Sequence, residues 1–242
     1  MRILIISDIH ANLTALEAVI AAAGEIDAAW CLGDLVGYGP DPNECISRVR
    51  ALPNLVCIMG NHDAAALNLI DTSSFNPEAR KAIQWTQDTL TRASASFLRN
   101  LQEKLRFDQV TISHGSPRHP VWEYLLDTRT ALINFDYFDT DYCFVGHTHL
   151  PVIYNLRDGS NNVALQIPEP DTKRALISRT IVNPGSVGQP RDRDPRASYA
   201  IFDTVEDTWE HYRQSYDIEA VQDRMTAVKL PQRHVQRLAA GW

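Results

Sequence analysis

Five short apolar segments of this 242-residue chain are each followed at once by a polar motif that contains aspartate, histidine or asparagine. The apolar segments have the length and composition of buried strands. In open α/β sheets, ligands bind at the carboxyl ends of the strands, and glycine permits the sharp turns that bring side chains together there. We therefore expect one site built from Ser7-Asp8-Ile9-His10, Gly33-Asp34, Gly60-Asn61-His62-Asp63, Ser113-His114-Gly115 and Gly146-His147-Thr148-His149.

The first third of the chain alternates predicted strands with predicted helices, which favours a parallel sheet flanked by helices. Asp41 is the expected N-cap of the second helix, because Pro42 follows it at the first helical position. Strands are expected over residues 2–7, 28–32 and 55–59, and helices over 12–23 and 42–52.

The rest of the chain is rich in predicted strands. A helical region covers residues 76–101 with a break near Thr91, and a last helix is expected from Asp217 to Lys229. The strands between them indicate a second sheet packed on the first. Because the chain has no internal repeat and no low-complexity tract, we expect a single domain over residues 1–242. The later strands are expected over 110–113, 142–145, 152–155, 163–167, 180–183, 199–203 and 208–216.

Composition limits the partners of the protein. A formal net charge of −7 argues against a nucleic-acid-binding surface built on bulk positive charge, but it is compatible with a small anionic substrate held by metal ions. No apolar run approaches membrane-spanning length, and the N-terminal one is too short for a signal peptide. The four cysteines form no CxxC pair, which favours free thiols. We expect a cytoplasmic protein without a membrane partner, and the oligomeric state stays open.

The five motifs together offer nitrogen and oxygen ligands and no thiolate. Such a set suits manganese, iron or zinc better than copper(I) or an iron–sulfur cluster. Asp8 and His10 stand two residues apart, so an extended strand would present both on one face. Taken alone, Asp8 or Asn61 is also explained as a helix N-cap, and a single histidine as an ordinary core or surface residue. Five of the eight histidines fall inside the motifs, however, and this coincidence favours a metal site.

The order of the motifs resembles the signature of the calcineurin-like metallophosphoesterases: DxH, GDxx, GNHD or GNHE, a later HG, and GHTH or GHxH. Three longer stretches are similar to the small bacterial phosphodiesterase branch of that family, namely residues 33–44, 114–125 and 183–192. The resemblance implies a four-layer α/β/β/α sandwich of two mixed sheets flanked by helices. It also implies a phosphoesterase with two divalent transition-metal ions, manganese first and iron, zinc, nickel or cobalt as the alternatives.

The resemblance also implies which residues act. One metal is expected on Asp8, His10, Asp34 and His149, and the other on Asp34, Asn61, His114 and His147, with Asp34 as the bridge. The implied reaction is attack on phosphorus by a metal-bridging water, without a covalent intermediate. His62 is expected to protonate the leaving group, and Asp63 to orient His62 and keep it cationic.

The chain departs from the protein phosphatases of this family at one place. They continue the second motif with an arginine that clamps phosphate, whereas this chain has Gly37-Tyr38-Gly39-Pro40. A phosphoprotein substrate is therefore disfavoured, and a small phosphodiester or phosphomonoester is expected. Arg191, Arg118 or His119 could replace the missing arginine, although a solvated salt bridge is an equally simple role for Arg191.

Other readings stay open at this stage. A non-catalytic metal-binding scaffold of the same fold is the main alternative, and the intact ligand positions favour the enzyme. A nuclease is disfavoured by the acidic, short chain. Trp122, Tyr124 and Tyr38 could stack on a nucleobase, but packing is the commoner role of such rings. The remaining histidines His211 and His234 are expected at the surface.

Overall fold

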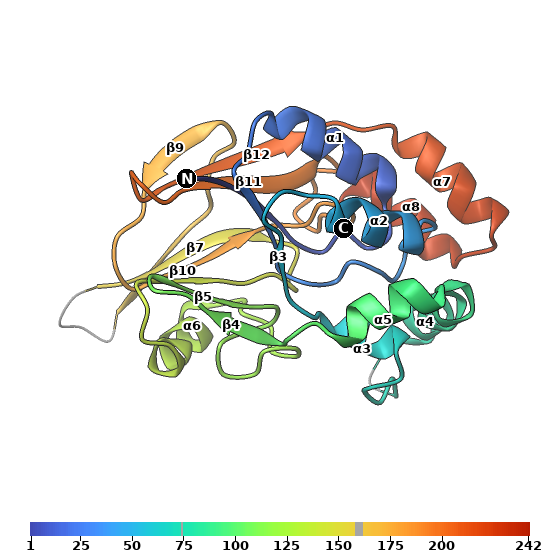
Figure 1. The fold of residues 1–242 in the computed structure, drawn as a ribbon, viewed down its shortest axis with the longest axis horizontal. Coiled ribbons are helices and arrows are strands. Elements are labelled where there is room, and N and C mark those ends of the chain that lie inside the picture. Colours follow the sequence, from blue (N-terminus) through green and yellow to red (C-terminus); the bar gives the residue numbers. More distant parts are fainter. Residues whose placement is uncertain (74, 158–161) are drawn as a thin grey trace.

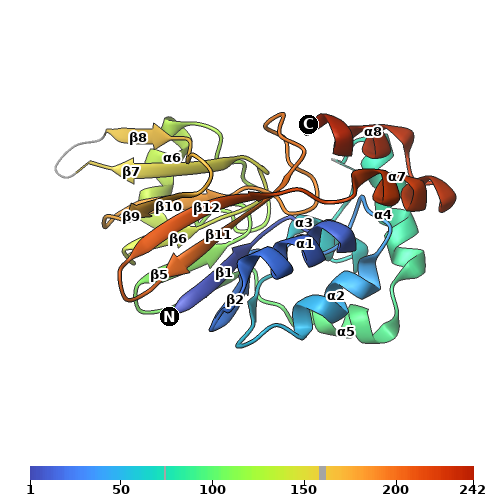
Figure 2. The same cartoon turned by 90° about the horizontal axis from the view of Figure 1, so that it is seen from above.

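The computed structural model describes residues 1–73, 75–157 and 162–242 of the chain. Its strands form two six-stranded mixed sheets, which lie face to face (Figures 1 and 2). The first sheet has the order β3-β2-β1-β11-β12-β9, in which β1, β2 and β3 are parallel and β11 runs antiparallel to β1. Its strands are β1 (Arg2–Ile6), β2 (Ala28–Cys31), β3 (Val56–Cys57), β9 (Thr172–Ala175), β11 (Ala197–Asp203) and β12 (Thr208–Gln214).

The second sheet has the order β4-β5-β6-β10-β7-β8. Strands β5, β6 and β10 are parallel to one another, and β4 and β7 pair with this group in the antiparallel sense. The strands are β4 (Lys104–Arg106), β5 (Val110–Ser113), β6 (Tyr142–Phe144), β7 (Pro151–Leu156), β8 (Val163–Gln166) and β10 (Thr180–Pro184).

The layer between the two sheets is an apolar core rich in aromatic rings. Phe144 of β6 is fully buried, and its ring centroid lies 5.1 Å from those of Phe202 and Trp209 on the first sheet. Both pairs meet edge to face, the arrangement that the ring quadrupoles favour. Leu4 and Ile6 of β1 point instead into the core on the helical side of the first sheet, as the period of two along a strand requires.

Helices cover the outer face of each sheet. Helix α1 (Leu13–Ala23) packs on β11 and β12 of the first sheet beside α2 (Pro42–Arg50), and α6 (Thr128–Asn134) packs on β7 and β8 of the second. The order of layers is therefore helix, sheet, sheet, helix, and the predicted four-layer α/β/β/α sandwich is confirmed.

Further helices gather at one end of the two sheets, on the right of Figure 1. A separate apolar cluster joins α4, α7 and α8 to Tyr38 from the loop after β2. This end carries the loops that follow the parallel strands, so the helices form walls around them. The helices are α3 (Asn61–Ala66), α4 (Pro77–Thr89), α5 (Arg92–Arg99), α7 (Ile218–Ala227) and α8 (Gln232–Ala240).

Several local predictions agree with the structure, and others need correction. The helical region does break near Thr91, which accepts a hydrogen bond from Ser94 N as the N-cap of α5. Asp217 caps α7 as expected. Asp41 stands at the N-cap position of α2 but makes no capping hydrogen bond, because its carboxylate pairs with Arg224 of α7 at 2.9 Å. Elements that the sequence did not predict are α3, α6, α8, β4 and β9.

Two further features bear on the expectations from composition. The four cysteines are all free thiols. Among the described residues, none of the helices combines the length and the apolar character that a membrane crossing needs.

Candidate metal centre

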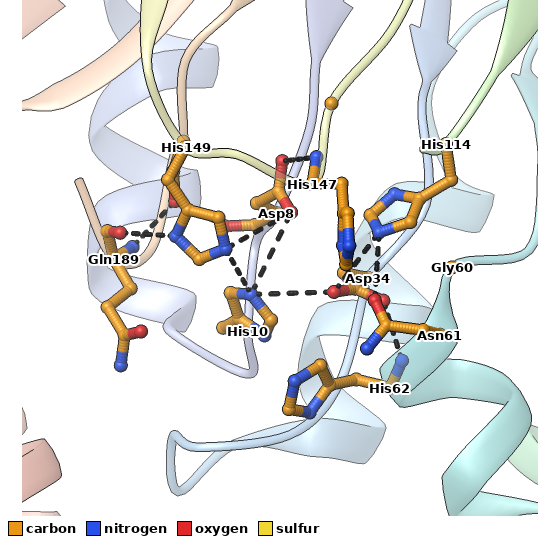
Figure 3. Close-up of polar contacts among 12 residues, drawn as sticks. Asp8, His10, Asp34, Gly60, Asn61, His62, His114, His147, His149 and Gln189 are labelled. Carbon is orange, nitrogen blue, oxygen red and sulfur yellow. Dashed lines mark hydrogen bonds and ion pairs between the residues drawn. The ribbon is translucent and has the colours of Figure 1, made fainter. Parts of the chain in front are cut away.

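The carboxyl ends of five parallel strands from the two sheets meet at one place. Strands β1, β2 and β3 deliver the first three motifs, and β5 and β6 of the second sheet deliver the last two. Figure 3 shows the side chains of these motifs pointing toward one another. The structure thus brings together all seven residues that the sequence suggested as ligands, and every one of them is buried: Asp8, His10, Asp34, Asn61, His114, His147 and His149.

One group of ligand atoms surrounds His10. Its Nε2 lies 3.1 Å from Nε2 of His149 and 3.9 Å from Oδ1 of Asp8, and the His149 nitrogen is 3.3 Å from the same Asp8 oxygen. Three donor atoms from the loops after β1 and after β6 therefore face a single point, as a metal site requires.

A second group surrounds Asp34. Its Oδ2 lies 3.3 Å from Nε2 of His114, and that nitrogen is 3.1 Å from Oδ1 of Asn61. His147 offers a further ring nitrogen to the same group. The Asp34 oxygen is also 3.6 Å from Nε2 of His10, so this carboxylate lies between the two groups.

The Nε2 atoms of His10 and His149 lie so close together that their lone pairs repel each other unless a proton or a cation lies between them. Nδ1 of His10 lies 3.1 Å from the Val36 carbonyl oxygen. Nδ1 of His149 contacts the Gln189 carbonyl oxygen, as Figure 3 shows. A carbonyl only accepts, so each Nδ1 carries a proton and each Nε2 of a neutral ring presents a lone pair. These two lone pairs converge at 3.1 Å, which fits a cation between them.

Three buried polar atoms of the candidate ligands have no hydrogen-bond partner among the described residues: Asp8 Oδ1, Asp34 Oδ2 and His147 Nε2. Each remaining carboxylate oxygen is used, since Asp8 Oδ2 accepts from the His147 amide at 3.0 Å and Asp34 Oδ1 from the His62 amide at 2.8 Å. A buried carboxylate oxygen without a partner is costly. Carboxylate oxygens beside neutral imidazoles suit a divalent transition-metal ion, so the residues present fit such an ion.

Burial and close charges shift the pKa values in this site. Burial lowers the pKa of His10, His147 and His149 well below the usual value, so these imidazoles are neutral and able to donate a lone pair. Burial also raises the pKa of Asp8 to about 6, and the nearby charge of Asp34 adds to the effect while His114 opposes it.

Asp34 and His114 shift in opposite directions as a pair. Burial alone would raise the pKa of Asp34, but the charges of His114 and His62 hold it below its usual range. Burial alone would lower the pKa of His114, but the Asp34 carboxylate raises it to about 10. A cation close to Asp34 would take over the role that His114 plays in this pair.

The backbone is strained where it presents the ligands. Five of the seven candidate ligands have φ between 48° and 65°, in the left-handed region that residues with a Cβ rarely adopt. Gly33 has φ 95°, and a Cβ there would lie 2.7 Å from the Gly60 amide nitrogen, so the second and third motifs touch through glycine. The five are Asp8, His10, Asp34, His147 and His149.

Asp63 does not hold His62, and this prediction was wrong. The Asp63 carboxylate accepts hydrogen bonds from the backbone amides of Asp34 at 2.9 Å, Gly60 at 3.0 Å and Val36 at 3.2 Å. It occupies the third position of helix α3, with Gly60 at the N-cap, so it forms half of a capping box. That spacing was the signal that could have assigned Asp63 to the backbone.

His62 is buried between aromatic rings next to the candidate metal ligands. Its ring centroid lies 4.3 Å from that of Tyr38 and 4.9 Å from that of His10. Nδ1 has no hydrogen-bond partner within the part of the chain that the structure describes, and it faces Gly37, where a Cβ would lie 2.5 Å away. Burial lowers the pKa of His62 to about 4, although Asp34 partly opposes the shift, so the prediction that Asp63 keeps it cationic was wrong as well.

The two arginines suggested for phosphate binding lie in different surroundings. Arg191 donates to Gln189 Oε1 at 3.1 Å, its guanidinium carbon is 6.0 Å from the Tyr38 ring centroid, and its charge lowers the pKa of Asp8 and of His10. Arg118 pairs with Glu123 instead. The exposed His119 lies next to Arg118 in the same loop.

The end of β10 and the loop after it also hold the motifs in place, a role that the sequence did not predict for them. Asn183 donates to the Gly146 carbonyl oxygen at 2.6 Å and to Thr148 Oγ1 at 3.0 Å, which fixes the last motif. Ser186 Oγ donates to the Asp8 carbonyl oxygen at 2.8 Å. The quoted stretch 183–192 was a signal, but single residues within it could not be assigned without the contacts.

Two histidines expected at the surface are buried. His234 of α8 is fully buried, and its ring centroid lies 4.6 Å from that of Tyr38. His211 of β12 is also buried, and its Nε2 lies 2.8 Å from Ser198 Oγ. Both positions depend on contacts between distant parts of the chain, which a search for local motifs does not reveal.

The chain is similar in sequence and in structure to several known proteins. The chain matches the calcineurin-like phosphoesterase superfamily domain over residues 1–207. A metallophosphoesterase of Sphaerobacter thermophilus with a known crystal structure is 47% identical, with a TM-score of 0.91 and coverage of 100% of this chain and 99% of that one. An uncharacterised protein of Methanocaldococcus jannaschii is 37% identical over 247 residues, covering 99% of this chain and 98% of its own.

A more distant relative matches only part of the chain. A symmetrical bis(5′-nucleosyl)-tetraphosphatase of Pectobacterium carotovorum is 32% identical over 101 residues, which are 35% of this chain and 36% of the relative. A hypothetical protein of Pyrococcus horikoshii has the same fold, with a TM-score of 0.82 at 20% identity.

Proposed function

The chain belongs to the calcineurin-like phosphoesterase superfamily, and from this premise we propose that it hydrolyses a small phosphate ester with two divalent metal ions bound at the strand ends. The position of Asp34 carries the proposal. Its unpartnered Oδ2 lies 3.6 Å from the nitrogen of His10 in one group and 3.3 Å from that of His114 in the other. A carboxylate in that place can serve two ions at once.

The chain's own residues divide into two ligand sets. When bound, such ions activate a water molecule and offset the negative charge of a phosphate. We assign Asp34 to both sets because it lies between them. Manganese is the first ion to test. The first set is Asp8, His10, Asp34 and His149, and the second is Asp34, Asn61, His114 and His147.

Arg191 is the better candidate for holding the substrate phosphate. Its Nε is buried and has no hydrogen-bond partner among the described residues, and its positive charge reaches the ligand groups, because it opposes the rise that burial causes in the pKa of Asp8. An anionic phosphate at the site would satisfy both the charge and the free donor. Arg118 has its guanidinium engaged by Glu123, so it contributes to this role only if that pair opens. The Asn61 amide can also donate to a phosphate oxygen.

His62 is assigned the transfer of a proton to the leaving alkoxide. Since Nδ1 faces Gly37, Nε2 is the nitrogen left to reach the substrate. The low pKa of about 4 that burial imposes would leave the ring neutral before substrate binds. An anionic ester beside it raises that pKa, so His62 takes up its proton as the substrate arrives and releases it to the leaving group.

The experiment is a paired assay on protein stripped of metal by a chelator. Mn²⁺, Ni²⁺, Co²⁺, Zn²⁺ or Mg²⁺ is added back, and hydrolysis of p-nitrophenyl phosphate is compared with that of bis(p-nitrophenyl) phosphate. We expect turnover with at least one ion, the diester being the better substrate, and two bound ions per chain by elemental analysis. Tight binding of metal with no turnover of either ester would favour the non-catalytic scaffold instead.

A further inference from the structure

A cavity of about 260 Å³ opens beside Asn61 and His62. This volume lies just below the range of roughly 300–1,000 Å³ that is typical of small-molecule sites. The cavity therefore has room for one ring system next to the candidate metal centre. Its other walls are Tyr38, Phe75, Asn76, Ala79, Trp122 and Tyr124.

Aromatic rings form most of these walls. The Phe75 ring meets His62 edge-on at 5.2 Å and Trp122 edge-on at 5.7 Å between centroids. The Tyr124 ring lies 3.8 Å from that of His147. Trp122 and Tyr124 are 41% and 47% exposed, so packing in the core does not account for them, whereas Tyr38 is buried in the cluster with α8. Exposed rings around a cavity offer faces on which a planar ligand can stack.

The loop that carries Trp122 and Tyr124 is held in place by the residue between them. The Glu123 carboxylate accepts hydrogen bonds from Ser116 Oγ at 2.7 Å and Asn134 Nδ2 at 2.8 Å, and it pairs with Arg118. Arg118 and Asn134 lower the pKa of Glu123 to about 2 although burial raises it, so the carboxylate stays charged. This anchor presents the neighbouring rings to the cavity at little cost in entropy when a ligand binds.

Asn76 adds a polar group to the wall of the cavity. Its Oδ1 accepts from the amides of Glu78 and Ala79 as the N-cap of α4. The oxygen is thereby fixed, and the amide nitrogen of this residue in the cavity wall carries two N–H donors. A donor beside stacking rings distinguishes a heterocycle that carries acceptors from a plain hydrocarbon ring.

We infer that this cavity binds the nucleobase of a nucleoside phosphate ester, with Trp122 and Tyr124 as the stacking rings and Asn76 as the donor to the base. The inference rests on the proposed function, because the adjacent metal centre holds the phosphate. It narrows the substrate class from small phosphate esters in general to nucleotides.

The test compares the binding of adenosine 5′-phosphate, ribose 5-phosphate and phenyl phosphate to the metal-supplemented protein by calorimetry. Stacking of a base on an aromatic side chain favours binding, so we expect adenosine 5′-phosphate to bind about tenfold or more tightly than ribose 5-phosphate. Trp122→Ala should reduce this ratio toward one. Asn76→Asp keeps the helix cap but removes the donor, and it should reduce the ratio by a few-fold. Tyr137→Ala changes an aromatic residue of 48% exposure outside the cavity and should leave the ratio unchanged.

Each contrary result has a distinct meaning. Equal binding of adenosine 5′-phosphate and ribose 5-phosphate, in protein that hydrolyses bis(p-nitrophenyl) phosphate, overturns the nucleobase site and leaves the proposed function intact. Phenyl phosphate binding as tightly as adenosine 5′-phosphate also overturns it, in favour of a plain aryl group. A preference for the base that depends on Trp122, in protein that hydrolyses no ester with any metal, supports the cavity and refutes the proposed function.

Discussion

The layer between the two sheets and the strand ends beside it are both buried, yet their chemistry is opposite. Between the sheets, rings such as Phe144 and Phe202 pack edge to face on regular strands. At the strand ends, buried carboxylates and imidazoles meet without enough partners, and the backbone at Asp8 and Asp34 has positive φ. The layer between the sheets stabilises the fold, and this stability offsets the cost of the strained, polar site at the strand ends.

This contrast predicts that substitutions in the two regions should affect activity and stability differently. A change at the strand ends should above all remove activity, because these groups serve the site more than the packing of the fold. A change between the sheets should do the reverse. The predictions below test that difference in order of expected effect.

Asp34→Asn should have the largest effect. It keeps the oxygen that accepts from the His62 amide but removes the charge between the two ligand groups. We expect binding of both ions to weaken and turnover to fall by about 10⁴-fold, equivalent to about 5 kcal/mol. The free energy of unfolding of the metal-free protein should fall, because the lowered pKa of Asp34 means that its charge, paired with His114, stabilises the folded state. Elemental analysis, steady-state kinetics and urea unfolding measure the three quantities.

The matched control is Asp139→Asn, because this carboxylate lies at the surface with a side-chain exposure of 76% and pairs with Arg106. It should leave metal content and turnover unchanged. If Asp34→Asn retained two tightly bound ions, the bridging role of Asp34 would be refuted.

Phe144→Ala should show the opposite pattern. Deleting a fully buried ring between the sheets opens a cavity and should lower the free energy of unfolding by about 4 kcal/mol. The turnover of the molecules that remain folded should change little, because the ring lies away from the ligand groups. Urea unfolding followed by circular dichroism and an assay at low temperature give both values. The control Val205→Ala changes a side chain of 81% exposure and should alter neither the free energy of unfolding nor the turnover. A Phe144→Ala protein as stable as the unmodified protein would contradict the proposed difference between the layer of the two sheets and the strand ends.

His62→Ala should have a smaller and selective effect. Without a proton donor, esters with poor leaving groups should be hydrolysed about 10²-fold more slowly, whereas activated p-nitrophenyl esters should lose only a few-fold. The comparison uses kcat for an alkyl and an aryl phosphodiester with the same metal. Equal losses on both would show that His62 positions the substrate and does not protonate the leaving group.

Features that depend on residues close together in the sequence could be predicted, and features that depend on contacts between distant segments could not. The five motifs and the two sheets could be predicted because strand patterns and Gly-rich turns are local signals. The role of Asp63 was missed because its neighbour in sequence, His62, is not its partner in space, since the helical turn directs the carboxylate to backbone amides.

Contacts between distant segments account for the other errors. Helix α8 has nine residues, too few to be stable by propensity alone, and it forms because it packs on Tyr38 and α7. His234 and His211 lack neighbouring motifs, so nothing local distinguished them from surface histidines. Their burial is a property of the folded chain, and it has a measurable consequence.

The smallest predicted effect is on the pH dependence of stability. Burial lowers the pKa of His211 to about 3 in the folded protein, whereas the unfolded chain takes up the proton near the ordinary value of about 6.5. The unfolded state therefore binds more protons below pH 6.5, and stability falls as the pH falls. Between pH 7.5 and 5.5 this histidine should contribute a loss of about 1 kcal/mol. His211→Gln, which can still donate to Ser198, should remove that part of the slope in urea unfolding, and the exposed His119→Gln should not. An unchanged slope in His211→Gln would mean that His211 is protonated to the same extent in the folded and unfolded states.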